Sequence, residues 1–142
     1  MNRSFFLIAS LVLLSSVGCG QASEQKATPT GSGTTTVELV TDLKPAAFKA
    51  AIDEGKARLI DVRTPGEYSS GHLAGSVNID WTGADYEKAF GELDPKVPVL
   101  LYCRSGGRSG QAMEHLRSKG FTVQHMQGGI TSWQQAGYPV QQ

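Results

Sequence analysis

The segment 103–109, with the sequence Cys-Arg-Ser-Gly-Gly-Arg-Ser, contains the residue types best suited to chemistry. It follows the apolar run 97–102, so it places a thiol at the end of an expected buried strand, where a glycine-rich turn leads into an expected helix. Backbone N–H groups in such a turn, together with the positive end of the helix dipole, favour an anion or a thiolate. We therefore predict that Cys103 is a nucleophile, the alternative being an inert free cysteine that ends a core strand.

The residues beside this thiol would form a cradle for it. Arg104 and Arg108 have a guanidinium geometry that suits an oxyanion, so they could attract and orient a negatively charged substrate. The sequence leaves open whether Arg108 points into the site or holds the loop from behind. The cradle is expected to consist of Arg104, Ser105, Gly106, Gly107, Arg108 and Ser109.

The other cysteine, Cys19, follows a segment that is typical of export. A basic Arg3, an almost wholly apolar stretch over 5–14 and small residues before Cys19 predict a secretory signal over residues 1–18. The apolar stretch is short for a membrane-spanning helix. Small residues that run directly into a cysteine resemble the lipobox of bacterial lipoproteins, although Ser16 stands where that motif usually has Leu. The resemblance implies that Cys19 becomes the first mature residue and carries a lipid.

We therefore expect an exported lipoprotein, anchored to a membrane through Cys19 and facing the periplasm or the cell exterior. A conventionally cleaved signal, which would give a soluble periplasmic protein, and an uncleaved anchor are the alternatives. If Cys19 is acylated, Cys103 has no other cysteine to pair with, so a reactive thiol enters an oxidising compartment. Residues 19–36, dominated by small and polar types, predict a flexible linker, and residues 37–142 the folded domain.

Charge and composition exclude several other classes of function. The chain has thirteen basic and thirteen acidic residues and no basic tract with interleaved aromatic residues, so nucleic acid is not an expected partner. His115 and His125 have no cysteine or carboxylate cluster at ligand spacing, so no metal site is expected. We expect no cofactor.

Strand and helix patterns alternate along the domain. This alternation predicts an α/β fold of three layers, in which a central, mostly parallel sheet is flanked by helices on both faces. The expected strands are 36–41, 58–62, 76–79, 97–102 and 121–126, and the expected helices begin at 45, 86, 107 and 130. Ligand sites in such folds lie at the carboxyl ends of the strands, which is where Cys103 falls on the most apolar and therefore central strand.

Five motifs occur in the order and spacing of a known family. Together they resemble a single-domain rhodanese over nearly all of residues 37–140, with Ala74 and Asp80 where many members have Pro. The motifs are Leu59-Ile60-Asp61-Val62-Arg63, Glu67-Tyr68, the run from Gly71 to Ile79, the run from Cys103 to Ser109, and Gly128-Gly129-Ile130 with Trp133. The resemblance implies the rhodanese-like fold.

It also implies a thiosulfate sulfurtransferase-like activity. In that family a cysteine thiolate, here Cys103, takes the outer sulfur of a donor such as thiosulfate, expels sulfite and holds the sulfur as a persulfide. The sulfur then passes to cyanide or to a thiol acceptor. The small-molecule donor and acceptor would be the partners, and the sequence does not say whether a protein serves as acceptor.

Three further residues could support the site. Asp61 and Arg63 look chemical, yet an acid and a base at the end of a strand, here with Glu67 nearby, more often form an ion pair that fixes the next segment. His72 could act as a general base for Cys103, but its counterpart in the resembled family belongs mainly to the loop framework.

Two alternatives to a sulfurtransferase remain. Cysteine phosphatases and arsenate reductases resemble this thiolate and arginine loop, but they separate the two residues by one residue more than the four between Cys103 and Arg108. The shorter loop favours a single sulfur atom over a tetrahedral oxyanion. The second alternative is a persulfide carrier or binding module without efficient turnover.

Overall fold

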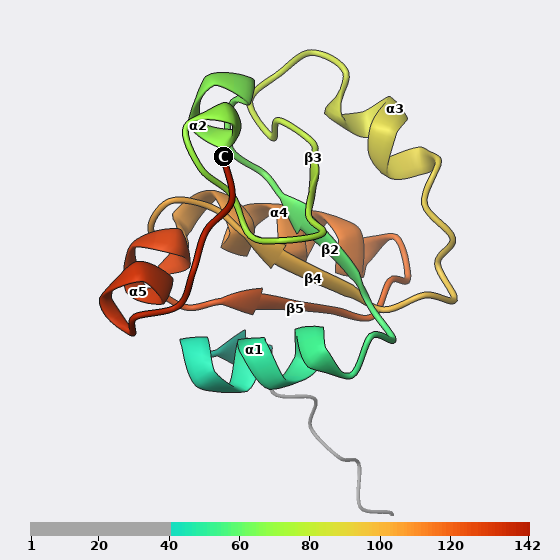
Figure 1. Cartoon of the computed structure of the whole chain (residues 1–142). Coiled ribbons are helices and arrows are strands. Elements are labelled where there is room, and N and C mark those ends of the chain that lie inside the picture. The colour runs from blue at the N-terminus through green and yellow to red at the C-terminus, as the bar shows by residue number, and fades with distance from the viewer. Residues whose placement is uncertain (1–40) are drawn as a thin grey trace, which may run out of the picture. The chain divides into compact units, whose positions relative to one another are not determined.

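The computed structural model describes residues 41–142, and these form an α/β domain. Five parallel strands make one sheet, with helices on both of its faces, as the sequence predicts (Figure 1). The signal, the linker, Cys19 and the domain boundary at residue 37 lie outside the described residues and stay predictions. None of the described helices has the length and apolar character needed to cross a membrane.

The sheet has the strand order β1-β5-β4-β2-β3, and every neighbouring pair is parallel. The strands point toward the left of Figure 1, so their carboxyl ends meet at one edge of the molecule. The strands are β1 (Asp42–Leu43), β2 (Arg58–Asp61), β3 (Val77–Asn78), β4 (Val99–Tyr102) and β5 (Val123–Met126). The helices are α1 (Pro45–Asp53), α2 (Pro65–Ser69), α3 (Tyr86–Gly91), α4 (Gly107–Ser118) and α5 (Gly129–Gln135).

Strand β4 lies in the middle of the sheet, as its continuous apolar run predicts. All four of its residues are buried, and alternate side chains enter two separate cores. Val99 and Leu101 pack with residues of α3 and α4, whereas Leu100 and Tyr102 pack with residues of α1 and α5. Cys103 continues the first of these rows, so its position is fixed by the packing of the whole sheet.

Two elements differ from the sequence prediction. Only Thr41 of the strand expected over 36–41 is described, and it lies outside β1, which begins at Asp42. The short helix α2 was not predicted, although its start carries a capping box in which Thr64 and Glu67 satisfy each other's backbone N–H, with a proline at the first helical position. The remaining elements form where expected, with ends that shift by one or two residues.

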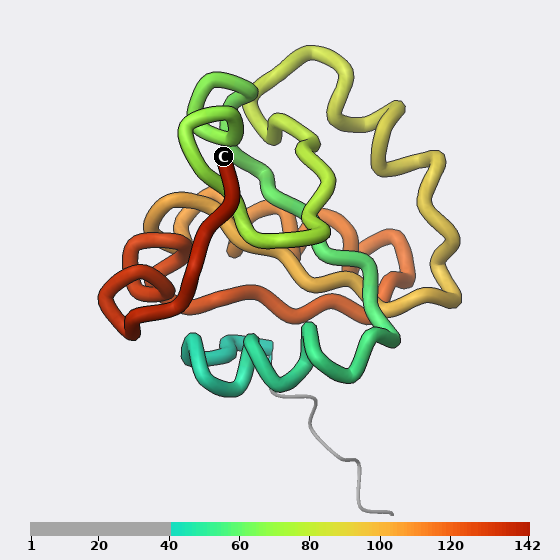
Figure 2. Tube along the Cα trace, in the orientation of Figure 1, coloured from blue at the N-terminus to red at the C-terminus, as the bar shows by residue number. Residues whose placement is uncertain are grey.

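The end of the chain returns to the edge of the sheet that carries the functional loop. Gln141 pairs with His72 through two backbone hydrogen bonds of 2.8 Å. Figure 2 shows this C-terminal segment running back beside the segment that follows α2. The loop after α2 is therefore held by the chain terminus as well as by the sheet.

Candidate active site

The thiol of Cys103 lies at the carboxyl end of β4, almost completely buried at 1% exposure. The Gly106 N–H donates to Sγ over 3.1 Å, and the Ser109 hydroxyl lies within donating reach of it at 3.6 Å. Burial acts to raise the pKa of this thiol, but hydrogen bonds from Ser109, Gly106 and Ser105 outweigh burial and lower it. The loop is therefore built to hold a thiolate.

The first residues of α5 fix the shape of the loop that begins at Cys103. The backbone N–H groups of Ile130 and Thr131 donate to the carbonyl oxygens of Cys103 and Arg104 over 2.8 and 3.1 Å. These carbonyls point toward α5, and in the same loop the Gly106 N–H points toward the sulfur. Gly129 permits the close approach, because its φ is +57° and a Cβ there would overlap the backbone of the cysteine loop.

A methyl group at position 129 should therefore destabilise the protein and disturb the thiol. We expect Gly129→Ala to lower the free energy of unfolding by at least about 2 kcal/mol, because strain at positive φ adds to a backbone overlap. Gly55→Ala is the matched control, since Gly55 has a similar φ of +66° but open space around it. Urea unfolding would measure both, and equal losses would contradict the role assigned to the close approach.

Arg108 holds the loop rather than pointing freely into it. Its two terminal nitrogens each donate to a carboxylate oxygen of Glu67 on α2 over 2.7 Å. This pairing selects the second of the two orientations that the sequence left open. The charge of Arg108 still interacts with that of Cys103, so it favours the thiolate from a distance. Glu67 pairs with Arg108 and not with Arg63, a partner that sequence reasoning did not identify.

The Glu67 ion pair should be lost in acid. The hydrogen bonds from Arg108 lower the pKa of Glu67 to about 2, below the value of about 4.3 expected in the unfolded chain. The stabilisation is therefore present above that unfolded pKa and disappears as the pH falls toward 2. We expect Glu67→Gln to cost about 1 kcal/mol at pH 7, because the pair is partly exposed, and progressively less in acid. Urea unfolding at several pH values would test this, and a pH-independent loss would contradict it.

Asp61 and Arg63 form the ion pair expected at the end of β2. Arg63 donates from Nε and Nη2 to the Asp61 carboxylate over 2.6 to 3.0 Å, and Nη2 also donates to the carbonyl of Gly71 over 2.7 Å. Both side chains are buried. Burial alone would lower the pKa of Arg63, but the Asp61 carboxylate outweighs it and raises that pKa. The pair thereby fixes the loop after α2 against the sheet.

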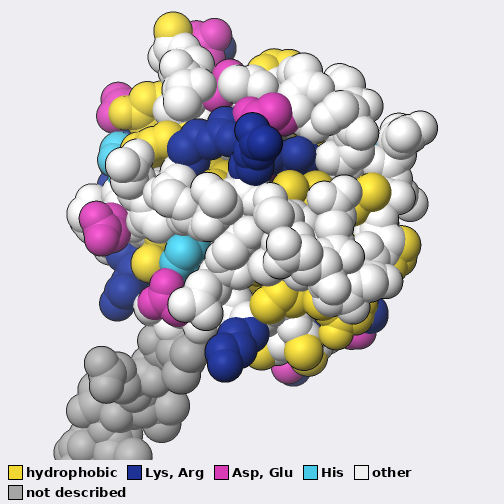
Figure 3. Space-filling view, turned by 90° about the vertical axis from the view of Figure 1, so that its left-hand side faces the viewer, with side chains coloured by type: hydrophobic (Ala, Val, Ile, Leu, Met, Phe, Trp, Pro, Cys, Tyr) yellow, Lys and Arg dark blue, Asp and Glu magenta, His cyan; other side chains and the backbone are white. Residues whose placement is uncertain are grey.

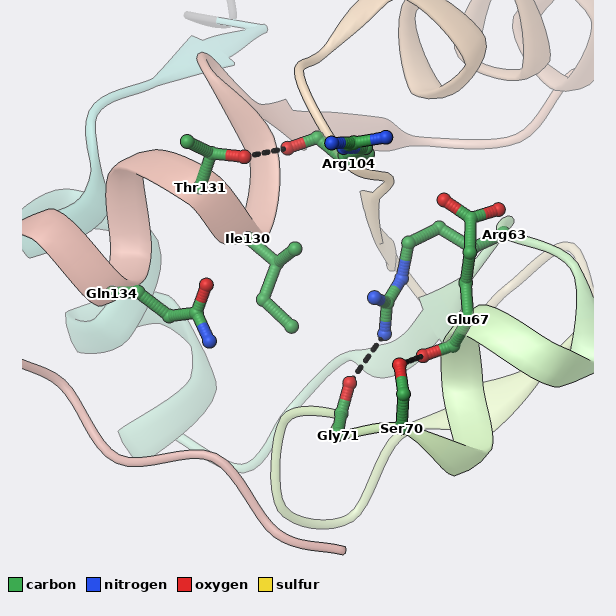
Figure 4. A pocket seen from close by; sticks show the side chains of 8 residues that line it. All are labelled: Arg63, Glu67, Ser70, Gly71, Arg104, Ile130, Thr131 and Gln134. Atoms are coloured by element: carbon green, nitrogen blue, oxygen red, sulfur yellow. Dashed lines mark hydrogen bonds between the residues drawn. The ribbon is translucent and has the colours of Figure 1, made fainter.

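A polar pocket of about 380 Å³ opens between α2 and α5. Figure 4 shows the Arg63 guanidinium pointing across it toward Gly71, with Ile130 and Gln134 on the α5 side. Arg104, which directly follows Cys103, also lines the pocket. Figure 3 shows Lys and Arg side chains gathered on this face beside Asp and Glu side chains. This pocket, which includes the residue that follows Cys103, therefore offers positive charge to an anion.

His72 has the contacts of a framework residue. Its ring stacks on Tyr68 with a centroid separation of 3.9 Å, and its Nδ1 lies 3.2 Å from the carbonyl oxygen of Tyr68. Its backbone pairs with Gln141. These contacts agree with the structural role expected for it and give no support to a general base.

Sequence reasoning missed two residues that adjoin the site. His125 lies 3.1 Å from the Ser109 hydroxyl and 2.6 Å from a carboxylate oxygen of Asp42. The sequence gives no local sign of the contact between His125 and Asp42, because the two residues are 83 positions apart in the chain. Over residues 41–142, no group of three or more His, Cys, Asp or Glu side chains is arranged to hold a metal ion.

Comparison with known proteins gives one family. The model of the family described as "Rhodanese-like domain" matches residues 44–136. A rhodanese-related protein from Thermoplasma volcanium has a similar solved structure, with a TM-score of 0.64, 30% sequence identity, and coverage of 70% of this chain and 96% of that one.

Two curated relatives extend the comparison. The protein named Thiosulfate sulfurtransferase 16, chloroplastic, of Arabidopsis thaliana is 35% identical over 97 residues, covering 58% of this chain and 78% of that protein. An uncharacterised protein of Bacillus subtilis is 40% identical over 79 residues, covering 55% of this chain. This chain spans 61% of the length of the Bacillus subtilis protein.

Proposed function

This chain belongs to the rhodanese-like domain family, and we propose that it is a sulfurtransferase that carries sulfur on Cys103. The observation that supports the proposal is the buried Cys103 thiol, with the Gly106 N–H donating to its sulfur over 3.1 Å. A lowered thiol pKa gives a nucleophile at neutral pH, and the same donors can hold the outer sulfur of a persulfide. The name of the Arabidopsis thaliana relative points to the same chemistry.

The proposed reaction has two displacements. The Cys103 thiolate attacks the outer sulfur of a donor such as thiosulfate, an Sγ–S bond forms, the donor S–S bond breaks, and its electron pair leaves with sulfite. Cyanide or a thiolate then attacks the outer sulfur of the persulfide, and the electron pair of the breaking Sγ–S bond returns to Cys103. Charge balances in both steps, and no external oxidant or reductant is needed.

The pocket lined by Arg104 supports an anionic donor and leaves room for an acceptor. Arg104 and Arg63 line a space of about 380 Å³, and a guanidinium suits a sulfonate group because it can donate in a bidentate manner. Arg63 already donates to Asp61 and Gly71, which leaves Arg104 as the better candidate for the donor. A thiol acceptor larger than cyanide would fit in the same space.

Intact mass spectrometry of the folded domain tests the proposal. After treatment with thiosulfate, the wild type should gain the mass of one sulfur atom, and cyanide should remove it with formation of thiocyanate. Cys103→Ala should gain nothing. An unchanged wild-type mass, or an equal gain in Cys103→Ala, would overturn the proposal.

Turnover separates an enzyme from a carrier, which shares the same loaded cysteine. We expect thiocyanate to form over many cycles when donor and cyanide are in excess. A single stoichiometric loading with slow release would instead assign the domain as a persulfide carrier.

We further propose that the protein is exported and attached to a membrane through a lipid on Cys19. The support is the basic start, the apolar stretch and the small residues before this cysteine. In bacterial cells, wild type should incorporate a fatty-acid analogue and sediment with membranes, whereas Cys19→Ala should do neither. Unlabelled wild type with a cleaved signal would instead indicate a soluble periplasmic protein, and an identical fate of both proteins would contradict lipidation.

A further inference from the structure

A line of hydrogen-bonding side chains runs from the protein surface to the sulfur of Cys103. It begins at Asp42 on β1, whose carboxylate Oδ1 lies 2.6 Å from His125 Nε2 on β5. His125 Nδ1 lies 3.1 Å from the Ser109 hydroxyl on α4, and that hydroxyl lies 3.6 Å from Cys103 Sγ. Three elements that are distant in sequence thus place these groups in contact.

Burial increases along this line. The Asp42 side chain is 59% exposed, the His125 side chain 9%, and Ser109 and Cys103 are buried at 0% and 1%. A polar group taken out of water needs a partner, and here each buried member finds one in the next. The arrangement connects a buried thiol to a carboxylate that water can reach.

The Ser109 hydroxyl has one hydrogen, so it can donate to only one acceptor at a time. Three acceptors compete for it: the Gly106 carbonyl oxygen at 3.1 Å, His125 Nδ1 at 3.1 Å and Cys103 Sγ at 3.6 Å. The Asp42 carboxylate can only accept, so His125 Nε2 carries a hydrogen and a neutral imidazole must accept from Ser109 at Nδ1. When both ring nitrogens are protonated, Nδ1 donates to Ser109, and the serine hydrogen is free for the sulfur.

We propose that His125 is a positioning residue that takes up the Cys103 proton through Ser109 and keeps the thiolate supplied with a hydrogen bond. In this step the S–H bond breaks as an O–H bond forms on Ser109, and the original Ser109 O–H bond breaks as an N–H bond forms at His125 Nδ1. Asp42 stays ionised and stabilises the imidazolium. No oxidant or co-reactant is consumed.

The use of this thiolate for sulfur transfer rests on the proposed function, whereas the proton step itself does not. Sulfur is exchanged between anions in both displacements, so the proton needs to leave Cys103 only once. A nearby imidazolium then offsets the negative charge of the thiolate and of the persulfide.

Other charged groups face the two ends of the line. At the sulfur, the charge of Arg108 from α4 favours the thiolate, and Arg108 also interacts with Asp61 of β2 and with Glu67 of α2. At His125, Asp42 of β1 is the charged group in contact, while Gly110 of α4 and Leu101 of β4 add uncharged neighbours. Arg108 and the hydrogen bonds of the loop therefore set part of the thiol acidity, and replacement of His125 should reveal the share that depends on His125.

Alkylation by iodoacetamide across a range of pH tests the proposal without any sulfur donor. The rate follows the thiolate fraction. We expect His125→Gln to shift the reactivity profile of Cys103 upward by about one pH unit, so that the rate on the acidic side of the profile falls about tenfold. Asp42→Asn, at an exposed position, should move the profile in the same direction by less. His115→Gln is the matched control, because the His115 ring packs against Trp81, Tyr86 and Phe90 instead.

A double variant removes any purely structural explanation. Ser109→Ala breaks the hydrogen-bonded path between His125 and the sulfur, so adding His125→Gln to it should shift the alkylation profile no further. Profiles that superimpose for wild type, His125→Gln and Asp42→Asn, or a full further shift when His125→Gln is added to Ser109→Ala, would overturn the proposal. A shifted alkylation profile in a protein that forms no persulfide would instead refute the proposed function and leave the proton step standing.

Discussion

Replacing Cys103 by serine should lower the rate of thiocyanate formation from thiosulfate and cyanide by at least about 10³-fold. The serine oxygen would keep the donors from the loop, but its pKa lies far above that of a thiol, so almost no alkoxide would be present near neutral pH. The serine oxygen would also have to bind the transferred sulfur through an O–S bond instead of the S–S bond of a persulfide. Steady-state assays on the folded domain, with thiocyanate as the readout, would measure the loss.

Stability and the second cysteine provide the controls for this variant. Cys103→Ser should unfold in urea within about 1 kcal/mol of wild type, because the volume change is small and the hydroxyl finds the same donors. In the same assay on the full-length chain, Cys19→Ser should retain full activity, since Cys19 lies in the predicted signal and linker region. Residual activity above a tenth of wild type would place the nucleophile elsewhere.

The architecture could be predicted because each layer leaves a periodic signal. The apolar run that ends at Tyr102 marks the central strand, and Gly120, with a φ of +89°, lies just after α4, where a glycine commonly ends a helix. Strand β1, at the edge of the sheet, is only two residues long, and α2 five, too short for a period to appear. The capping box of Thr64 and Glu67, together with Pro65 at the first helical position, is the local signal that indicates the start of α2.

The candidate site could be predicted only as far as it is local in sequence. The cradle of Cys103 lies within seven consecutive residues, and Asp61 pairs with Arg63 two positions away. The partners of Arg108 and His125 lie 41 and 83 positions away, and only the folded sheet brings them together. The sequence alone therefore leaves the orientation of Arg108 open and does not identify Asp42 as a partner of His125.

Each of these long-range contacts holds a different part of the site. The α5 amides hold the loop carbonyls, Glu67 holds Arg108, and the Asp61 and Arg63 pair holds the segment that carries His72. The side chain of Arg104 forms none of these anchoring contacts; only its backbone carbonyl is held, by Thr131. A rigid cradle with one adaptable cation is suited to donors of different shape.

Replacing Asp61 by asparagine should give the largest loss of stability among these residues, about 3–5 kcal/mol in the free energy of unfolding. Asparagine keeps the size and one acceptor oxygen, but it removes the charge and replaces the second oxygen that accepts from Arg63 with an NH2 donor. The Arg63 side chain, 6% exposed, would then remain buried without its counter-charge. Urea unfolding at pH 7, followed by circular dichroism, would measure the loss.

Two further variants decide whether the uncompensated charge is the cause. Asp53→Asn makes the same chemical change in an exposed pair with Lys49, where the side chains are 60% and 40% exposed, and should cost no more than about 0.5 kcal/mol. The double variant Asp61→Asn, Arg63→Met removes both charges, so it should recover at least half of the loss, although the Gly71 carbonyl loses its donor. If the double variant were less stable than Asp61→Asn alone, the hydrogen bonds of Arg63 to the loop, and not its charge, would dominate the stability of this corner of the sheet.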